Sequence, residues 1–290
     1  MESVGTVKAA VIQLECKLSR SAGNMKRAER YILQAIEEGA QLVCLPEAFL
    51  TSGNILEVSE VAVTIPGECT ARLGELARQG GVHLVAGLLE KDGETHYSTS
   101  VLIGPTGELL GKYRRVHCFE LEKQYLATGD TFEVFETPVG RIGMLQGYDV
   151  NFPEATRELY RRGADIIVCS ALIPEQYAYV TRQLLPARVI ESQSYLLFVS
   201  GLGSNTFAGF SYMGGSEVLA DPLFLEQEKF DFVDGDEHLL VMERDEGLRT
   251  VELDVRRLRK YRKERSLLGD LEPRTYWRET RAAAVARLGS

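Results

Sequence analysis

The chain has 290 residues, of which 44% are hydrophobic and 26% are charged, and its formal net charge is −9. This composition is typical of a globular protein with a sizeable core, and the acidic balance excludes non-specific nucleic-acid binding, which needs a basic surface. No apolar run approaches the roughly 20 residues of a membrane span, and the first residues do not predict a secretory signal.

Cysteine and histidine usage predicts a cytoplasmic protein without a metal site. The five cysteines are scattered, odd in number and mostly in apolar segments, which is typical of buried thiols in a reducing cytosol rather than of disulfides. No cysteine pair has CxxC spacing and the four histidines lie far apart, so a zinc site is not expected.

The first predicted elements place a carboxylate at the end of a buried strand. A strand over 7–13 precedes a helix that Asn24 can cap and that runs to about residue 38. The apolar run 42–45 is the next strand, and Glu47 follows it almost directly. Sheets of α/β proteins bind ligands at such strand ends, although a solvent-exposed loop glutamate is an equally good interpretation on position alone.

The middle of the chain predicts a helix near 70–80 and then a strand-rich meander over 82–88, 97–103 and 108–113. The segment 114–123 follows and mixes cations, a histidine, a thiol and carboxylates. A solvated charged loop is one interpretation. Apolar residues within the segment favour partial burial instead.

The segment 141–154 predicts a strand, a turn and a helix in close succession. An apolar run ends near Gly147, and Pro153 suits the first position of a helix. A strand-to-helix turn can hold one residue exposed at the mouth of a site. Here the residue at the apex, Gly147, has no side chain. The buried strand 165–169 completes a βαβ-type unit.

The last third predicts further elements of the same domain. They are a long helix over 175–194 interrupted at Pro186, a strand over 195–200, a glycine- and aromatic-rich region over 207–221, strands near 239–243 and 249–253, and a basic helix from Asp254. The absence of repeats and linkers predicts one domain over 1–276, followed by a helical tail over 277–290.

Four stretches in this order resemble the nitrilase superfamily of carbon–nitrogen hydrolases: Leu45-Pro46-Glu47, 113–117, 121–123 with Gly129-Asp130, and 143–154. The resemblance covers about residues 6–276, and the amidase and carbamoylase branches are the most similar. It implies an α/β fold, a four-layer α-β-β-α sandwich with two mixed β-sheets. It also implies a homodimer or higher homo-oligomer, a small-molecule ligand and no cofactor.

The resemblance also implies site residues, two of which depart from the family. Glu47 matches the family's general base and Glu122 its second glutamate. The family's lysine falls on Arg115, and its cysteine nucleophile falls on Gly147. Further residues are expected to border the pocket: Tyr148, His117, Cys118, Cys169 and the rim segment 207–215.

The two departures leave the chemistry open. Arg115 could form a network with Glu47 and Glu122 that keeps both carboxylates ionised and lowers their pKa, or it could bind a substrate carboxylate or an oxyanion. Cys118 or Cys169 could replace the nucleophile, although buried cysteine is usually inert.

Three hypotheses follow from the loss of the thiol. The chain is a ligand-binding pseudoenzyme, an enzyme of altered, thiol-independent mechanism that uses Glu47 and Arg115, or an ordinary amidase or nitrilase inactivated by substitution at Gly147.

Overall fold

The computed structural model describes residues 4–206, 209–225 and 236–270. The strands of its first sheet are, in spatial order, β14 (Gly247–Asp254), β1 (Thr6–Gln13), β2 (Leu42–Cys44), β3 (His83–Asp92), β4 (Thr95–Ile103) and β5 (Leu109–Arg114). Those of the second sheet are β13 (His238–Val241), β12 (Glu217–Leu219), β9 (Tyr195–Ser200), β8 (Ile166–Ala171), β7 (Gly140–Gln146) and β6 (Val134–Thr137). A short ladder joins β10 (Ser204–Asn205) to β11 (Phe210–Ser211).

Both sheets are mixed and follow the same plan. In the first, β1, β2 and β3 are parallel, and β14, β4 and β5 are antiparallel to their neighbours. In the second, β7, β8 and β9 are parallel, and β6, β12 and β13 are antiparallel to theirs. Parallel strands need helical crossovers, which explains why helices cover the outer faces.

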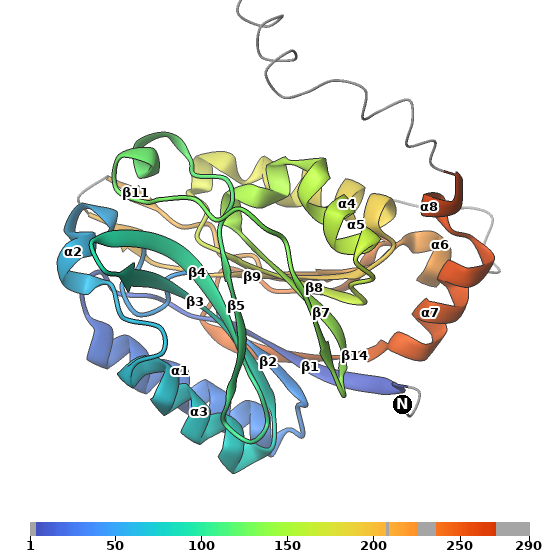
Figure 1. Ribbon diagram of the computed structural model, residues 1–290, viewed down its shortest axis with the longest axis horizontal. Coiled ribbons are helices and arrows are strands. Elements are labelled where there is room, and N and C mark those ends of the chain that lie inside the picture. Colours follow the sequence, from blue (N-terminus) through green and yellow to red (C-terminus); the bar gives the residue numbers. More distant parts are fainter. Residues whose placement is uncertain (1–3, 207–208, 226–235, 271–290) are drawn as a thin grey trace, which may run out of the picture.

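The helices lie outside the two sheets (Figure 1). They are α1 (Ser21–Glu37), α2 (Val58–Val61), α3 (Glu68–Gly80), α4 (Pro153–Arg161), α5 (Leu185–Ser192), α6 (Pro222–Leu225), α7 (Val255–Glu264) and α8 (Leu267–Asp270). In the figure, α1 and α3 cover the first sheet from below, and α4 and α5 cover the second from above. The predicted four-layer α-β-β-α sandwich is confirmed.

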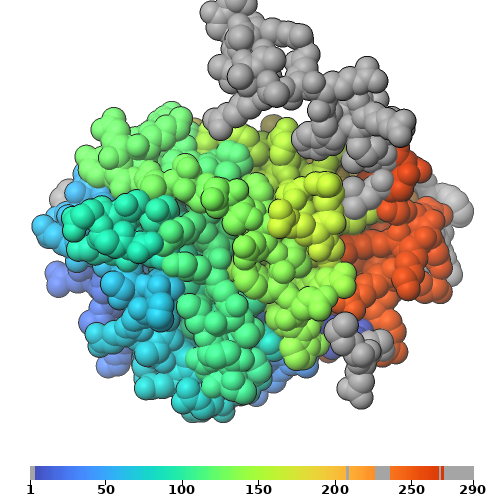
Figure 2. Space-filling model, in the orientation of Figure 1, coloured from blue at the N-terminus to red at the C-terminus, as the bar shows by residue number. Residues whose placement is uncertain are grey.

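The strand pleat divides the core into two parts. On β1, Ala9 and Val11 join the cluster between the sheets, whereas Ala10 and Ile12 join the cluster under α1 and α3. Side chains alternate between the faces of a strand, so an almost fully apolar strand serves both clusters. In the space-filling view, residues coloured blue to green pack directly against those coloured yellow-green to orange (Figure 2).

Two local predictions are wrong. Helix α1 begins at Ser21, so Asn24 lies inside its first turn rather than capping it; its side chain donates to the carbonyls of Lys17 and Leu50 and fixes the neighbouring loops. The long helix over 175–194 is broken into a 3-10 turn, a π-helix over Val180–Leu184 and α5. Pro186 has no N–H to continue a regular helix and occupies the first turn of α5.

None of the helices in the described ranges has the length and apolarity that crossing a bilayer requires. The predicted tail over 277–290 lies outside the described residues, and the domain boundary at residue 276 stays a prediction.

Candidate functional site

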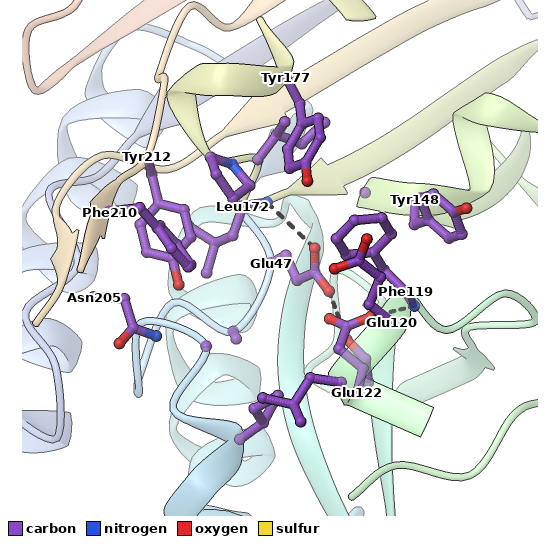
Figure 3. A pocket seen from close by; sticks show the side chains of 18 of the residues that line it. Glu47, Phe119, Glu120, Glu122, Tyr148, Leu172, Tyr177, Asn205, Phe210 and Tyr212 are labelled. Carbon is purple, nitrogen blue, oxygen red and sulfur yellow. Dashed lines mark hydrogen bonds between the residues drawn. The ribbon is translucent and has the colours of Figure 1, made fainter. Parts of the chain in front are cut away.

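A cavity of about 440 Å³ opens where strands of both sheets end. Its wall includes Glu47 from the turn after β2 and Leu172 from the end of β8 (Figure 3). Arg115 from the end of β5 and Gly147 from the end of β7 also line it. Glu122 comes from the 3-10 turn Glu120–Gln124. Four predicted residues that lie far apart in the sequence therefore meet in one cavity.

Glu47 is held by three hydrogen bonds in this cavity. Its Oε1 accepts hydrogen bonds from Ser98 Oγ at 2.8 Å and Arg115 Nη1 at 2.8 Å, and its Oε2 accepts one from the Leu172 backbone N–H at 3.2 Å. Gly87 on β3 permits this placement, because a β-carbon there would lie 2.5 Å from the Glu47 Cα. The side chain is 8% exposed, so the interpretation as a solvent-exposed loop residue is wrong.

Arg115 lies between the two glutamates. Besides its bond to Glu47, its Nη2 lies 2.6 Å from Glu122 Oε2, and the side chain is 3% exposed. The predicted Glu–Arg–Glu network is therefore present. Burial lowers the pKa of Arg115, but the carboxylates of Glu47 and Glu122 raise it more, so that the pKa lies above the ordinary value. The guanidinium therefore stays charged.

The prediction that this network lowers the pKa of Glu47 is wrong. Burial raises the pKa of Glu47 to about 7, and the nearby charge of Glu122 also raises it. Arg115, Ser98 and the Leu172 N–H lower the pKa, but the raising effects of desolvation and Glu122 together prevail. A carboxylate with a pKa near neutrality is a better general base than an exposed glutamate.

Gly147 lies directly against this carboxylate. It begins the 3-10 turn Gly147–Asn151 after β7, and its φ of +26° lies in a region that favours glycine. A β-carbon at this position would lie 2.7 Å from Glu47 Oε2. Any larger residue at 147 therefore requires the carboxylate to move.

Asp149 joins this turn to the segment after β5. The buried carboxylate accepts hydrogen bonds from the Tyr113 hydroxyl at 2.7 Å and from the His117 backbone N–H at 3.1 Å, and it lies 2.8 Å from His117 Nδ1. The His117 ring stacks on Phe152 at 3.7 Å. His117 is thus placed behind the cavity wall rather than in it.

The two predicted thiols are also absent from the described cavity wall. Cys118 and Cys169 are both buried, and Cys118 Sγ is directed at the Leu126 and Ala127 carbonyls. Burial raises the pKa of both thiols, that of Cys169 well above its ordinary value. Since the thiolate is the nucleophilic form, neither cysteine is suited to act as a nucleophile.

Aromatic side chains form much of the cavity wall. Tyr148 lines it as predicted, and its ring lies 4.9 Å from that of Phe119, which packs against Tyr177 at 5.5 Å. Phe210 and Tyr212, from the predicted rim segment, line the other side (Figure 3). Residues 207 and 208 of that segment lie outside the described residues.

Sequence reasoning missed three partners of the site: Ser98, Leu172 and Tyr177. Ser98 lies within a predicted strand and nothing in its neighbourhood distinguishes it. Leu172 contributes a backbone N–H, which no residue type reveals. The position of Leu172 directly after a buried strand was the one usable signal among the three, since strand ends position ligands.

The Glu47→Gln variant tests the raised pKa of this carboxyl. An acid whose pKa is raised by folding stabilises the protein fully below its unfolded pKa, and this contribution is lost as the pH rises through about 7. The stability advantage of the wild type over Glu47→Gln should therefore shrink by about 2 kcal/mol between pH 5 and pH 8. Urea unfolding at both pH values measures it. If the stability advantage of the wild type grew with pH instead, the pKa of Glu47 in the folded protein would be lowered, and the effect of Arg115 would exceed that of burial.

Comparisons with known proteins show the family of this chain. Residues 8–224 match the family model described as carbon-nitrogen hydrolase. The chain is 38% identical over 221 residues to a nitrilase from Pyrococcus abyssi, covering 74% of this chain and 82% of that protein. It is 32% identical over 204 residues to an omega-amidase from Homo sapiens, covering 67% and 74%.

A solved structure matches the fold as well. A variant of the amidase from Nesterenkonia sp. AN1 in complex with butyramide superposes with a TM-score of 0.76 and 25% identity, over 90% of this chain and 95% of that one. The family match and the fold match each cover most of the described residues. This chain belongs to the carbon–nitrogen hydrolase family, the nitrilase superfamily.

Proposed function

We propose that this chain binds a small amide-, nitrile- or carbamoyl-type molecule in the cavity over Glu47 and works without a cysteine nucleophile. In this proposal Gly147 occupies the position of the family's cysteine, and Arg115 that of its lysine. The contact geometry at Gly147 carries the proposal: a β-carbon there would lie 2.7 Å from Glu47 Oε2 and 3.9 Å from Arg115 Nη1. This position faces a base and a cation, as a nucleophile must, yet glycine offers no atom that attacks a carbonyl carbon.

The relatives support the ligand class. Those named above are a nitrilase, an omega-amidase and an amidase that was solved with butyramide. The Nesterenkonia amidase was also solved after Michael addition of acrylamide at its active site cysteine; that structure is 25% identical, has a TM-score of 0.75 and covers 89% of this chain and 97% of its own. The cavity of this chain has Glu47 and Arg115 in place to meet an amide, but no thiol in its described wall.

A second candidate is hydrolysis without a thiol. The raised pKa of Glu47, about 7, supports it, because such a carboxylate can take a proton from water near neutral pH. Arg115 would polarise the carbonyl group, and the space over Gly147 would hold the attacking water. A cyclisation or elimination on a nitrogen-containing substrate would use the same two groups.

The remaining alternative is an ordinary hydrolase inactivated by substitution at Gly147. Removing a cysteine would account for Gly147, but it leaves Arg115 at the lysine position without explanation. The family resemblance further suggests a homodimer or larger homo-oligomer, and the cysteine usage suggests a cytoplasmic location. Both are part of this proposal.

The test combines binding with turnover on one panel of amides, nitriles and N-carbamoyl compounds that includes butyramide. Calorimetric titration of the wild type should detect binding, while ammonia release should not exceed that of Glu47→Gln. Turnover by the wild type that Glu47→Gln abolishes would establish the thiol-independent mechanism instead. If the wild type neither binds nor turns over any compound of the panel, the proposal is overturned.

A further inference from the structure

The described residues of the cavity wall carry a net negative charge. Among the described lining residues, the charged side chains are those of Glu47, Glu120, Glu122 and Arg115; no lysine, histidine or second arginine is present. The single guanidinium is already shared by Glu47 and Glu122. The wall therefore keeps a net negative formal charge even when Glu47 is protonated.

Glu120 contributes a carboxylate that no group in the described part of the chain neutralises. It begins the 3-10 turn beside Phe119, its side chain is exposed, and it has no hydrogen-bond or ion-pair partner among the described residues. Its φ of +35° lies in the left-handed region, which is unusual for glutamate. Strained conformations of this kind are found preferentially at ligand sites.

The aromatic residues of the wall suit a positive charge. Phe119, Tyr148 and Tyr177 form a connected group on one side, and Phe210 and Tyr212 lie 5.4 Å apart on the other (Figure 3). The faces of aromatic rings attract cations, and aromatic residues are used in this way to recognise ammonium groups. Carboxylates together with aromatic rings thus favour a cationic group over an anionic one.

Arg115 independently points to an acceptor on the same ligand. It is 3% exposed and lines the cavity, and whereas Nη1 and Nη2 face Glu47 and Glu122, its Nε–H has no hydrogen-bond acceptor among the described residues. Buried N–H groups of a charged side chain are costly when unsatisfied. A neutral carbonyl oxygen would satisfy such a donor, whereas a ligand carboxylate would be repelled by the neighbouring glutamates.

We propose that the ligand is an amino amide: its carbonyl group lies against Arg115 and Gly147, and a positively charged amine at its other end lies against Glu120 and the aromatic wall. This rests on the proposed function, because it assigns a charge to the ligand of that same cavity. The ligand class then excludes amides that end in a carboxylate.

Matched probes test this charge preference. The cationic probes are 3-aminopropanamide, 4-aminobutanamide and 5-aminopentanamide; the neutral ones are butyramide and pentanamide, and the anionic one is succinamate. The best cationic probe should bind the wild type about tenfold more tightly than the neutral amides, and succinamate should bind most weakly. In 0.5 M salt the preference should shrink, since screening weakens exposed charges.

Single variants localise the effect. Glu120→Gln should reduce the ratio of cationic to neutral affinity several-fold. Glu37→Gln, which removes an exposed carboxylate at the end of α1, should leave that ratio at its wild-type value. Neutral amides that bind as tightly as cationic ones would overturn this inference but leave the proposed function standing. Absence of binding by every probe would overturn both.

Discussion

The double variant Gly147→Cys, Arg115→Lys should release ammonia from small amides at least about a thousandfold faster than the wild type, the scale on which a nucleophile contributes to hydrolysis. The thiol would enter a site where Glu47 is already positioned to act as its base, and the lysine would donate to the developing oxyanion. Both substitutions are needed because Arg115 fixes the Glu47 carboxylate against position 147. A β-carbon there would lie 2.7 Å from Glu47 Oε2.

The matched control is Gly147→Ala, Arg115→Lys, which introduces the same β-carbon at the same φ of +26° without sulfur. Its rate should stay at the wild-type level. Equal activity in both double variants would show that the thiol is not the source of the gain. Full activity in Gly147→Cys alone would favour the alternative of a hydrolase inactivated by a single substitution.

The Arg115→Met variant should lose about 3–5 kcal/mol of unfolding free energy at pH 8, the range for a buried ion pair that loses one partner. Methionine fills a similar volume but leaves Glu47 and Glu122 without their shared cation in a cavity where Glu47 is 8% exposed. Urea unfolding measures the loss. It should be smaller at pH 5, because Glu47, whose pKa is already raised to about 7, then binds a proton.

Arg161→Met is the control for this experiment. Arg161 pairs with Glu158 on the outer face of α4, with half of its side chain exposed. Surface pairs of this kind contribute about 1 kcal/mol or less. If the two variants lost the same small amount of stability, the Glu47–Arg115–Glu122 network would not be a buried ion pair in solution.

Much of the fold was predictable because its signals are local. The apolar strands over 42–45 and 165–169, the turn at Gly147 and the helix start at Pro153 each depend on a few neighbouring residues, and the structure has all of them. Asn24 and the helix over 175–194 were mispredicted because a competing contact or a missing N–H, rather than residue preference, decides where a helix begins.

The candidate site was predictable only in part. Glu47, Arg115, Glu122 and Gly147 were predicted from motif positions in the sequence, and the structure brings them into one cavity. Their surroundings were not predictable. Whether a thiol lines the wall, which serine and backbone N–H bind the carboxylate, and which aromatic rings line the cavity all depend on how the two sheets pack. The pKa of Glu47 depends on the same packing, because desolvation is a property of everything around a group rather than of its neighbours in sequence.

The sequence by itself thus indicated the two-sheet architecture, through its family resemblance, and the residues proposed for the base, cation and nucleophile positions, since covalent order and residue type carry that information. Only the tertiary structure decided that Glu47 is shielded from solvent, that its carboxylate lies against Gly147, and that the cavity wall has an excess of negative charge. Each of these depends on distances between side chains from different strands, and burial changes the free energy of a charge more than any residue preference does.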